Sequence, residues 1–544
     1  MHPGLLSNCV QKLWESRVAP LWDDVKETLS FMGSLILIQT FDFLPTVINT
    51  IICGHLGKLE LDSFAMATII LRTCGIFVGS GLSLACDTLV SQSYGRRNLK
   101  EVGLLLQRGI LILLLFCFPC WAIFINTKFI LLIFGQDPEL ARQTDVLVMI
   151  LVPAVPALFM NQLLGKYLRN QNIVLPQIVS GFAANILNAT LSAVCVYVLK
   201  LGTVAVMWTS VITAYSWLIL VVLFILWKKL LADTWGGWSR ECLQEWGVFV
   251  HFAFYGMLMM CLKWWTFEIG TFLTGQLGLV ELGAQAVMYQ FYFLAFLVPS
   301  VLGITVNVHV GIALGARNLT KAKRSACIAF SFTGFFALLI SILTMALKNV
   351  LGALFTNETK IVTLVSTLLP VLTAAVLFDA YTFMFAGILR ATGKQLLGAI
   401  INCVGYCIIG LSLEIVLMFP AKLGALGLWL GILVSVVFQF LWFLVVIVRL
   451  DWDKAVEEAQ VRAGLNPKGQ NLNLDPNARE KSSYTDHPLG DITDPEQAAS
   501  AAETSASGRV VLTKDLLVRR GAALSAAIAI LAAAILIRIF VSKD

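Results

Sequence analysis

The stretch Gly54-His-Leu-Gly-Lys-Leu-Glu-Leu61 decides the fold, because the chain repeats it 221 residues later as Gly275-Gln-Leu-Gly-Leu-Val-Glu-Leu282. Further matches recur at shifts of 220 to 222 residues. They pair Tyr94-Gly-Arg-Arg-Asn-Leu99 with Leu314-Gly-Ala-Arg-Asn-Leu319, Leu168-Arg169 with Leu389-Arg390, and Lys200-Leu-Gly202 with Lys422-Leu-Gly424. Matches at one offset are the signature of an internal repeat. We therefore predict two related halves.

The composition places both halves in a lipid bilayer. The 544 residues are 58% hydrophobic and 13% charged, which lies outside the range of soluble domains. Apolar runs of roughly 20 residues, each long enough to cross a bilayer as a helix, recur along the chain. They lie near 31–53, 64–94, 103–127, 143–165, 174–198, 203–227, 247–274, 282–313, 325–347, 361–389, 396–419 and 425–448. Strand alternation is absent, so we predict an all-α polytopic membrane protein.

The predicted helices divide the chain into six segments. These are a cytoplasmic N-terminal segment 1–30, an N-terminal six-helix lobe 31–227, a cytoplasmic linker 228–246, a C-terminal six-helix lobe 247–449, a cytoplasmic disordered linker 450–518, and a thirteenth helix with its tail 519–544. The disordered linker is rich in polar residues and proline and cannot bury enough apolar surface to fold. The run 521–537 is just long enough to span.

The number of helices in each half predicts how the halves are related. Six is even, so both halves enter the membrane in the same sense, related by a pseudo-two-fold axis along the membrane normal. Two such lobes around a central cleft can rock and expose the cleft to each side in turn. This arrangement favours a transporter over a channel, since no stretch resembles a selectivity filter.

Loop charge predicts the orientation. The loops after the even-numbered helices hold about twice as many Lys and Arg residues as the others. Those residues are Arg96, Arg97, Lys100, Lys166, Arg169, Lys228, Lys229, Arg240, Arg317, Lys321, Lys323, Arg324, Arg390 and Lys394. The N-terminus is therefore expected in the cytoplasm, and with thirteen helices the C-terminus is extracellular. The sequon Asn357-Glu-Thr359 then falls in an outward loop.

Several other functions find no support in the sequence. The net charge of +6 is scattered through short loops, so we expect no nucleic-acid partner. Cys117-Phe-Pro-Cys120 has metal-ligand spacing but lies in an apolar run without further ligands, so we expect neither a metal nor another cofactor. The motifs His-Glu-x-x-His and Gly-x-Ser-x-Gly are absent, so the chain is not predicted to be an enzyme.

Four stretches of the sequence are distinctive: Cys53-Gly-His-Leu-Gly-Lys-Leu-Glu-Leu-Asp62, Ala85-Cys-Asp-Thr-Leu-Val-Ser-Gln-Ser-Tyr-Gly95, Thr234-Trp-Gly-Gly-Trp-Ser239 and Val280-Glu-Leu-Gly-Ala-Gln285. Together they resemble those of vertebrate multidrug and toxin extrusion (MATE) proteins. The resemblance covers about residues 31 to 460 and returns weakly at the last helix. It implies a proton-coupled antiporter for organic cations, with a site of acidic and aromatic residues in the C-terminal lobe. The family's four acidic positions correspond to Lys263, Glu268, Gln290 and Asp379, of which two are not acidic here.

Ionisable residues at membrane depth are costly and therefore functional candidates. Glu268 follows Trp264 by four residues, so carboxylate and indole share a helix face and could contact one cation. Asp379 is a candidate for the same role, and a proton could compete with the cation at either acid. A purely structural, hydrogen-bonded acid is the alternative. Tyr289 and Tyr292 share a face and either line the cavity or face lipid.

Asp42 lies in the first helix between Gln39 and Pro45, where a proline kink indicates a polar pocket. The 221-residue offset carries Asp42 onto Lys263. Our hypothesis is that the two face each other across the cleft, or that each neutralises a nearby group. A lysine that snorkels or is deprotonated is the alternative. Glu414 is a further tentative acid, unless it is simply solvated.

The leading hypothesis is a monomeric proton/organic-cation antiporter in the plasma membrane, whose partners are small organic cations, protons and the bilayer. The alternative is a weakly coupled transporter of the same fold for neutral or anionic solutes, because Lys263 and Gln290 remove negative charge from the site.

Overall fold

A computed structural model describes residues 19–354, 358–464 and 514–541, and every regular element within these ranges is helical. The first half contains α2 (Ala19–Gly54), α3 (Lys58–Leu71), η2 (Arg72–Ile76), α4 (Phe77–Leu82), α5 (Ala85–Gly95), α6 (Leu99–Ile125), α7 (Thr127–Ile133), α8 (Pro138–Leu151), α9 (Ala154–Arg169), α10 (Leu175–Ala193), η3 (Val194–Val198) and α11 (Gly202–Trp227). A short helix, η4 (Arg240–Leu243), joins the halves.

The second half repeats this pattern and adds two helices. It contains α12 (Trp246–Gly275), α13 (Leu279–Gly315), α14 (Leu319–Ala346), α15 (Lys348–Leu351), η5 (Gly352–Leu354), α16 (Thr359–Thr392), α17 (Gln395–Asn402), η6 (Cys403–Gly410), α18 (Leu411–Met418) and α19 (Ala425–Val448). The additional helices are α20 (Trp452–Arg462) and α22 (Lys514–Val541).

By length and composition, the described residues contain twelve helices able to cross a membrane, and a bent pair supplies a thirteenth. The bent pair is α8 and α9, which meet at 57°. Pro153 stands at this break, where a proline removes a backbone donor and clashes with the preceding turn. The prediction of a polytopic, all-helical membrane protein is therefore confirmed.

Two predicted boundaries were wrong. Helix α2 begins at Ala19, inside the predicted segment 1–30. Two ion pairs of its first turns explain this extension. They join Asp24 to Arg324 (2.9 Å) and Glu27 to Lys321 (3.0 Å). Helix α20 lies inside the predicted disordered linker 450–518. The Asp451 carboxylate caps α20 by accepting the Lys454 N–H (3.1 Å). Residues 1–18, 465–513 and the sequon Asn357 lie outside the described residues.

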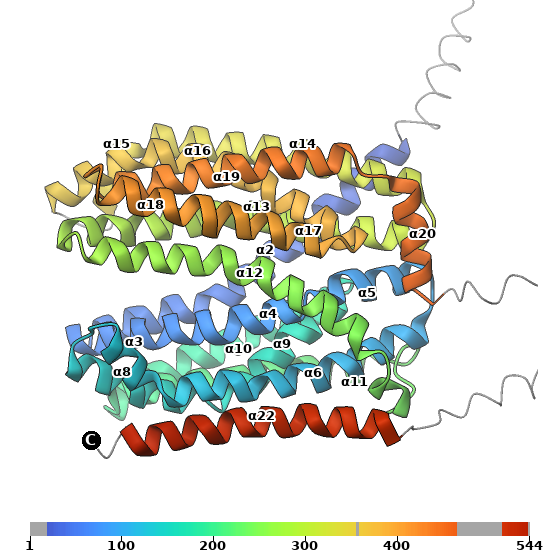
Figure 1. Cartoon of the computed structure of the whole chain (residues 1–544), viewed down its shortest axis with the longest axis horizontal. Coiled ribbons are helices and arrows are strands. Elements are labelled where there is room, and N and C mark those ends of the chain that lie inside the picture. Colours follow the sequence, from blue (N-terminus) through green and yellow to red (C-terminus); the bar gives the residue numbers. More distant parts are fainter. Residues whose placement is uncertain (1–18, 355–357, 465–513, 542–544) are drawn as a thin grey trace, which may run out of the picture.

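The two halves form two lobes that lie side by side (Figure 1). Helices α2–α11 form the N-terminal lobe and α12–α19 the C-terminal lobe. Helix α22 runs along the outer face of the N-terminal lobe, packed on α6. Its Arg538 binds Asp145 of α8 (2.8 Å), and the Asn126 side chain donates to the Ala534 carbonyl (3.1 Å). The thirteenth helix therefore packs mainly on the N-terminal lobe, and its Arg520 also lies over the Trp246 ring at the start of α12, 4.2 Å from the ring centre.

The lobes are joined at the end of the bundle that carries α20, here called the α20 end. Helix α5 packs against α13, and α4 against α12. Helix α20 hydrogen-bonds to both lobes: Gln460 donates to the Gly315 carbonyl (2.6 Å), Arg462 to Gln92 Oε1 (3.1 Å), and the Arg96 guanidinium to the Gln460 carbonyl (3.2 Å). These bonds hold the two lobes together at this end.

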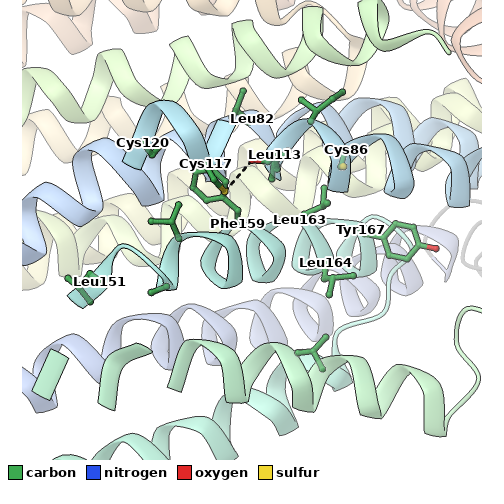
Figure 2. Close-up of a cluster of buried hydrophobic side chains, with 14 of the residues drawn as sticks. Leu82, Cys86, Leu113, Cys117, Cys120, Leu151, Phe159, Leu163, Leu164 and Tyr167 are labelled. Carbon is green, nitrogen blue, oxygen red and sulfur yellow. Dashed lines mark hydrogen bonds between the residues drawn. The ribbon is translucent and has the colours of Figure 1, made fainter. Parts of the chain in front are cut away.

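A cluster of buried hydrophobic side chains lies in the core of the N-terminal lobe (Figure 2). Cys117 and Cys120 of α6 lie among leucines and Phe159, and the Cys117 thiol donates to the Leu113 carbonyl one turn earlier (3.5 Å). Among the described residues, no group of three or more His, Cys, Asp or Glu side chains is arranged to hold a metal ion.

Candidate functional site

A central cavity of about 430 Å³ lies between the lobes and is lined by residues of both. Its charged lining residues are Asp42, Arg72, Asp87, Lys166, Arg169, Lys263 and Arg390. Its aromatic lining residues include Phe43, Phe77, Trp264, Phe296 and Phe383. Phe77 of the N-terminal lobe stacks on Trp264 of the C-terminal lobe with 5.2 Å between ring centroids. The cavity therefore combines aromatic faces with charges of both signs, a lining suited to amphipathic organic solutes.

Lys263 and Asp379 form a buried ion pair in the C-terminal lobe. The Lys263 Nζ lies 2.9 Å from Asp379 Oδ1 and 2.7 Å from Oδ2. Three hydroxyl groups also donate to this carboxylate: Tyr292 (2.6 Å), Thr382 (2.9 Å) and Tyr406 (3.4 Å). Asp379 thus accepts hydrogen bonds on both oxygens, and its charge is balanced inside the lobe.

Glu268 forms the second ion pair of the site, and this pair joins the two lobes. Its Oε1 lies 3.3 Å from the Arg72 guanidinium of η2. The Tyr289 hydroxyl donates to the same oxygen (3.2 Å), and the Arg72 guanidinium lies 5.7 Å from the centre of the Tyr289 ring. Because Arg72 and Glu268 belong to different lobes, any motion that separates the lobes here must break this pair.

Asp42 differs from both of these acids. Its side chain is exposed to the cavity and has no hydrogen bond or salt bridge within the described part of the chain. Pro45 has no N–H to donate to the carbonyl of Phe41 one turn earlier, and this freed carbonyl is the basis of the predicted polar pocket. In the structure, the Asn185 side chain donates a hydrogen bond to the Phe41 carbonyl (3.0 Å). Arg169 is close enough to interact with Asp42 electrostatically.

A cluster of buried charges closes the cavity toward the α20 end. Asp87 lies 3.5 Å from Arg390, and Asn170 donates to its Oδ1 (3.2 Å). Lys166 donates to both the carbonyl and the hydroxyl oxygen of Ser80. Sequence analysis wrongly placed Lys166, Arg169 and Arg390 in loops. They are buried near the ends of α9 and α16. The repeat match of Leu168-Arg169 with Leu389-Arg390 is a signal that could have identified the two arginines, but it does not include Lys166.

The structure brings most of the predicted site residues together. Gln39, Asp42, Lys263 and Trp264 line the cavity. Glu268 and Tyr289 contact the lining residue Arg72, while Asp379 and Tyr292 belong to the Lys263 network. Gln290 is exposed and does not line the cavity.

The two sequence hypotheses for Lys263 differ in outcome. The partner of Lys263 is Asp379 of its own lobe rather than Asp42 across the cleft. Lys263 therefore neutralises a nearby group, which was the second of the two hypotheses. Lys263 does not snorkel either, since its side chain is 7% exposed and its ammonium is paired. Among the described residues that line the cavity, Asp42 of the N-terminal lobe is therefore an acid without a salt bridge, whereas Lys263 is neutralised by Asp379 within the C-terminal lobe.

Glu414 is a buried acid outside this network. Only 1% of its surface is exposed, and neither carboxyl oxygen has a hydrogen-bond partner among the described residues. The expectation that it is simply solvated is therefore wrong. Gly270 and Gly431 pack around it, and a Cβ atom on Gly431 would lie 2.7 Å from its Cγ.

We expect Glu414→Met to raise the thermal unfolding midpoint of the purified protein. A buried polar group without a partner costs about 1 to 3 kcal/mol, and methionine has a similar volume with no such group. Glu281→Met is the matched control, because Glu281 accepts the Ala425 N–H (2.8 Å) and its loss should lower the midpoint. Equal destabilisation by both substitutions would contradict this prediction.

A cavity enclosed between two repeat-related helical lobes is the architecture of an alternating-access membrane transporter. The MatE family model matches residues 35–194 and 256–416. Multidrug and toxin extrusion protein 1 of Xenopus tropicalis is 44% identical over 533 residues, 96% of this chain and 92% of that protein. Multidrug and toxin extrusion protein 2 of Mus musculus is 44% identical over 522 residues, 94% of this chain and 91% of that protein.

A solved structure agrees with these relatives. The eukaryotic MATE transporter AtDTX14 superposes on this chain with a TM-score of 0.79 at 26% sequence identity. The match covers 81% of this chain and 99% of the AtDTX14 chain. The chain belongs to the MATE family of transporters. The resemblance inferred from its motifs is confirmed, and its relatives are named as transporters rather than enzymes.

Proposed function

We propose that this protein is a proton-coupled antiporter that exports small organic cations by alternating access. The observation that carries this proposal is Asp42, a carboxylate that faces the central cavity with no salt bridge or hydrogen bond among the described residues. A carboxylate can hold a proton or pair with a cation, but not both at once. The names of the relatives, multidrug and toxin extrusion proteins, support the direction of transport.

The aromatic lining supports a cationic, partly apolar solute. Phe43 follows Asp42 directly, and Phe77 and Trp264 form a stacked pair across the same cavity. Aromatic faces attract cations and bury apolar groups, so one organic cation can use both kinds of contact. In this proposal, protonation of Asp42 on the acidic side releases the cation there, and the proton leaves on the other side.

We further propose that the protein acts as a monomer in the plasma membrane with its α20 end in the cytoplasm. The basic residues that flank this end, among them Arg96, Arg97 and Arg317, support this orientation under the positive-inside rule. With thirteen spans the C-terminus would then be extracellular. The lobes joined at the α20 end make the present conformation one that is closed to the cytoplasm.

A second candidate, transport of neutral or anionic solutes, is favoured by one observation. Five basic residues line the cavity, Arg72, Lys166, Arg169, Lys263 and Arg390, against two acids. Three of the five are paired with carboxylates, which weakens this candidate.

Purified protein in liposomes with an acidic interior separates the two candidates. Antiport of cations predicts that the outward proton gradient drives uptake of tetraethylammonium and leaves benzenesulfonate uptake unchanged. Protein-free liposomes provide the background. Gradient-driven uptake of benzenesulfonate alone would favour the second candidate, and gradient-independent uptake of either probe would contradict proton coupling.

A further inference from the structure

The ammonium group of Lys263 lies in a cage of four aromatic rings. Its Nζ is 4.1 Å from the centre of the Phe296 ring, 5.6 Å from Phe383, 5.9 Å from Tyr292 and 6.0 Å from Trp264. The rings come from three helices, α12, α13 and α16, so the cage depends on the packed C-terminal lobe rather than on one local turn. Each distance is within the range of cation–π attraction.

The Asp379 carboxylate closes this cage. Both of its oxygens lie within 2.9 Å of the ammonium, and the hydroxyls of Tyr292 and Thr382 fix its orientation at 2.6 and 2.9 Å. Aromatic faces around a positive charge, with a carboxylate beside it, are how proteins bind ammonium ligands. The cage therefore has the chemistry of a binding site for an ammonium ligand, although the ammonium inside it belongs to Lys263 of the same chain.

We propose that Lys263 fills an organic-ammonium subsite with its own side chain and so excludes primary alkylammonium solutes from Asp379. Lys263, Phe296, Phe383 and Trp264 all line the central cavity, so the subsite opens to solutes once the lysine side chain is removed. Lys263 then determines specificity: it reserves the C-terminal carboxylate for an internal cation and leaves Asp42 as the cavity acid open to solutes. This inference deepens the proposed function, on which its transport measurement rests.

The variant Lys263→Ala tests the subsite directly. It removes Cγ, Cδ, Cε and Nζ, which together match n-propylammonium in length and charge. It also leaves Asp379 buried without its cation, which destabilises the protein. We expect its thermal unfolding midpoint to lie below that of the wild type and to rise with propylammonium concentration. The wild-type midpoint should respond much less, because only Asp42 is open to the solute there, and ethylammonium and butylammonium should act more weakly than propylammonium on the variant.

Two controls separate the subsite from general solvent effects. The neutral n-propanol has similar length and should leave the Lys263→Ala midpoint unchanged. The double variant Lys263→Ala/Asp379→Asn lacks both charges, so it should unfold at a higher temperature than the single variant and respond to propylammonium no more than the wild type does. If the single variant folds only when expressed with propylammonium, that dependence is itself the expected rescue.

The unfolding midpoint tests binding in the subsite, and the uptake measurement tests the proposed transport function separately. A Lys263→Ala midpoint that ignores propylammonium, or that responds equally in the double variant, overturns the proposal. Failure of the single variant to fold with any amine, while the double variant folds, overturns it as well. In liposomes, propylammonium uptake by Lys263→Ala should exceed that of the wild type by about tenfold. A midpoint that responds without any uptake supports the subsite and contradicts the proposed transport function.

Discussion

Asp42→Asn should abolish the response of organic-cation uptake to a pH gradient. Asparagine keeps the shape of the side chain but can neither release a proton nor balance a cation. A hydrogen-bonded contact with a charged group is worth about 1.5 to 3 kcal/mol, so cation affinity should fall roughly 10-fold to 150-fold. Folding should be little affected, since Asp42 has no salt bridge to lose among the described residues.

Tetraethylammonium uptake into liposomes at several internal pH values measures this effect. In the wild type, uptake should increase as the interior becomes more acidic, because protonation there releases the cation. In Asp42→Asn the curve should be flat, whereas Asp42→Glu should keep the slope. Asp23→Asn is the matched control: Asp23 is an exposed acid of the same helix and does not line the cavity. A pH response preserved in Asp42→Asn would place the coupling proton on another group.

The architecture was predictable because it follows from local patterns. Apolar runs define the spans, and a repeat with an even number of spans defines two lobes of the same orientation. Two features of the fold were not predicted, and each has a physical cause. The bend between α8 and α9 comes from Pro153, which a count of apolar residues does not register. Helix α20 depends on the Asp451 cap and on the buried Ala455 and Ala459, so its stability comes from packing that composition does not reveal.

The site was predictable residue by residue but not pair by pair. Intramembrane charge marks Asp42, Glu268 and Asp379 as candidates without any alignment. Their partners lie far along the chain: Lys263 is 116 residues from Asp379, and Arg72 is 196 residues from Glu268. Which charges meet depends on the rotation of each helix about its axis, and this is fixed by packing. The alternatives for Lys263 therefore could not be separated before its helix was placed.

Gly95→Ala and Gly315→Ala should shift the conformational equilibrium away from the closed α20 end. The two glycines are equivalent in the repeat, and each meets the backbone of the other lobe. A Cβ atom on Gly95 would lie 2.1 Å from the carbonyl oxygen of Ile312, and a Cβ atom on Gly315 would lie 2.1 Å from the carbonyl oxygen of Gln92. Gln92 and Ile312 are themselves separated by the repeat offset of 220 residues. The contact thus repeats across the pseudo-two-fold axis, and only glycine lets the lobes approach so closely.

Backbone atoms at this distance cannot move aside as a flexible side chain would. Overpacking costs typically 1 to 3 kcal/mol, so each alanine should reduce the ratio of closed to open molecules by roughly 5-fold to 150-fold, and the double variant by more. Transport should fall with it, since the cycle must pass through the closed state. The substitution Ser91→Cys reports the change, because Ser91 of α5 lies where the lobes meet: a Cβ on Gly311 of α13 would lie 2.2 Å from its Oγ. Modification of the new thiol by a maleimide, followed by peptide mass spectrometry, should be faster in both variants. Gly33→Ala is the matched control, because a Cβ there meets nothing within 4 Å. If the thiol introduced by Ser91→Cys is modified at the same rate with and without the two alanines, these glycines do not close the α20 end.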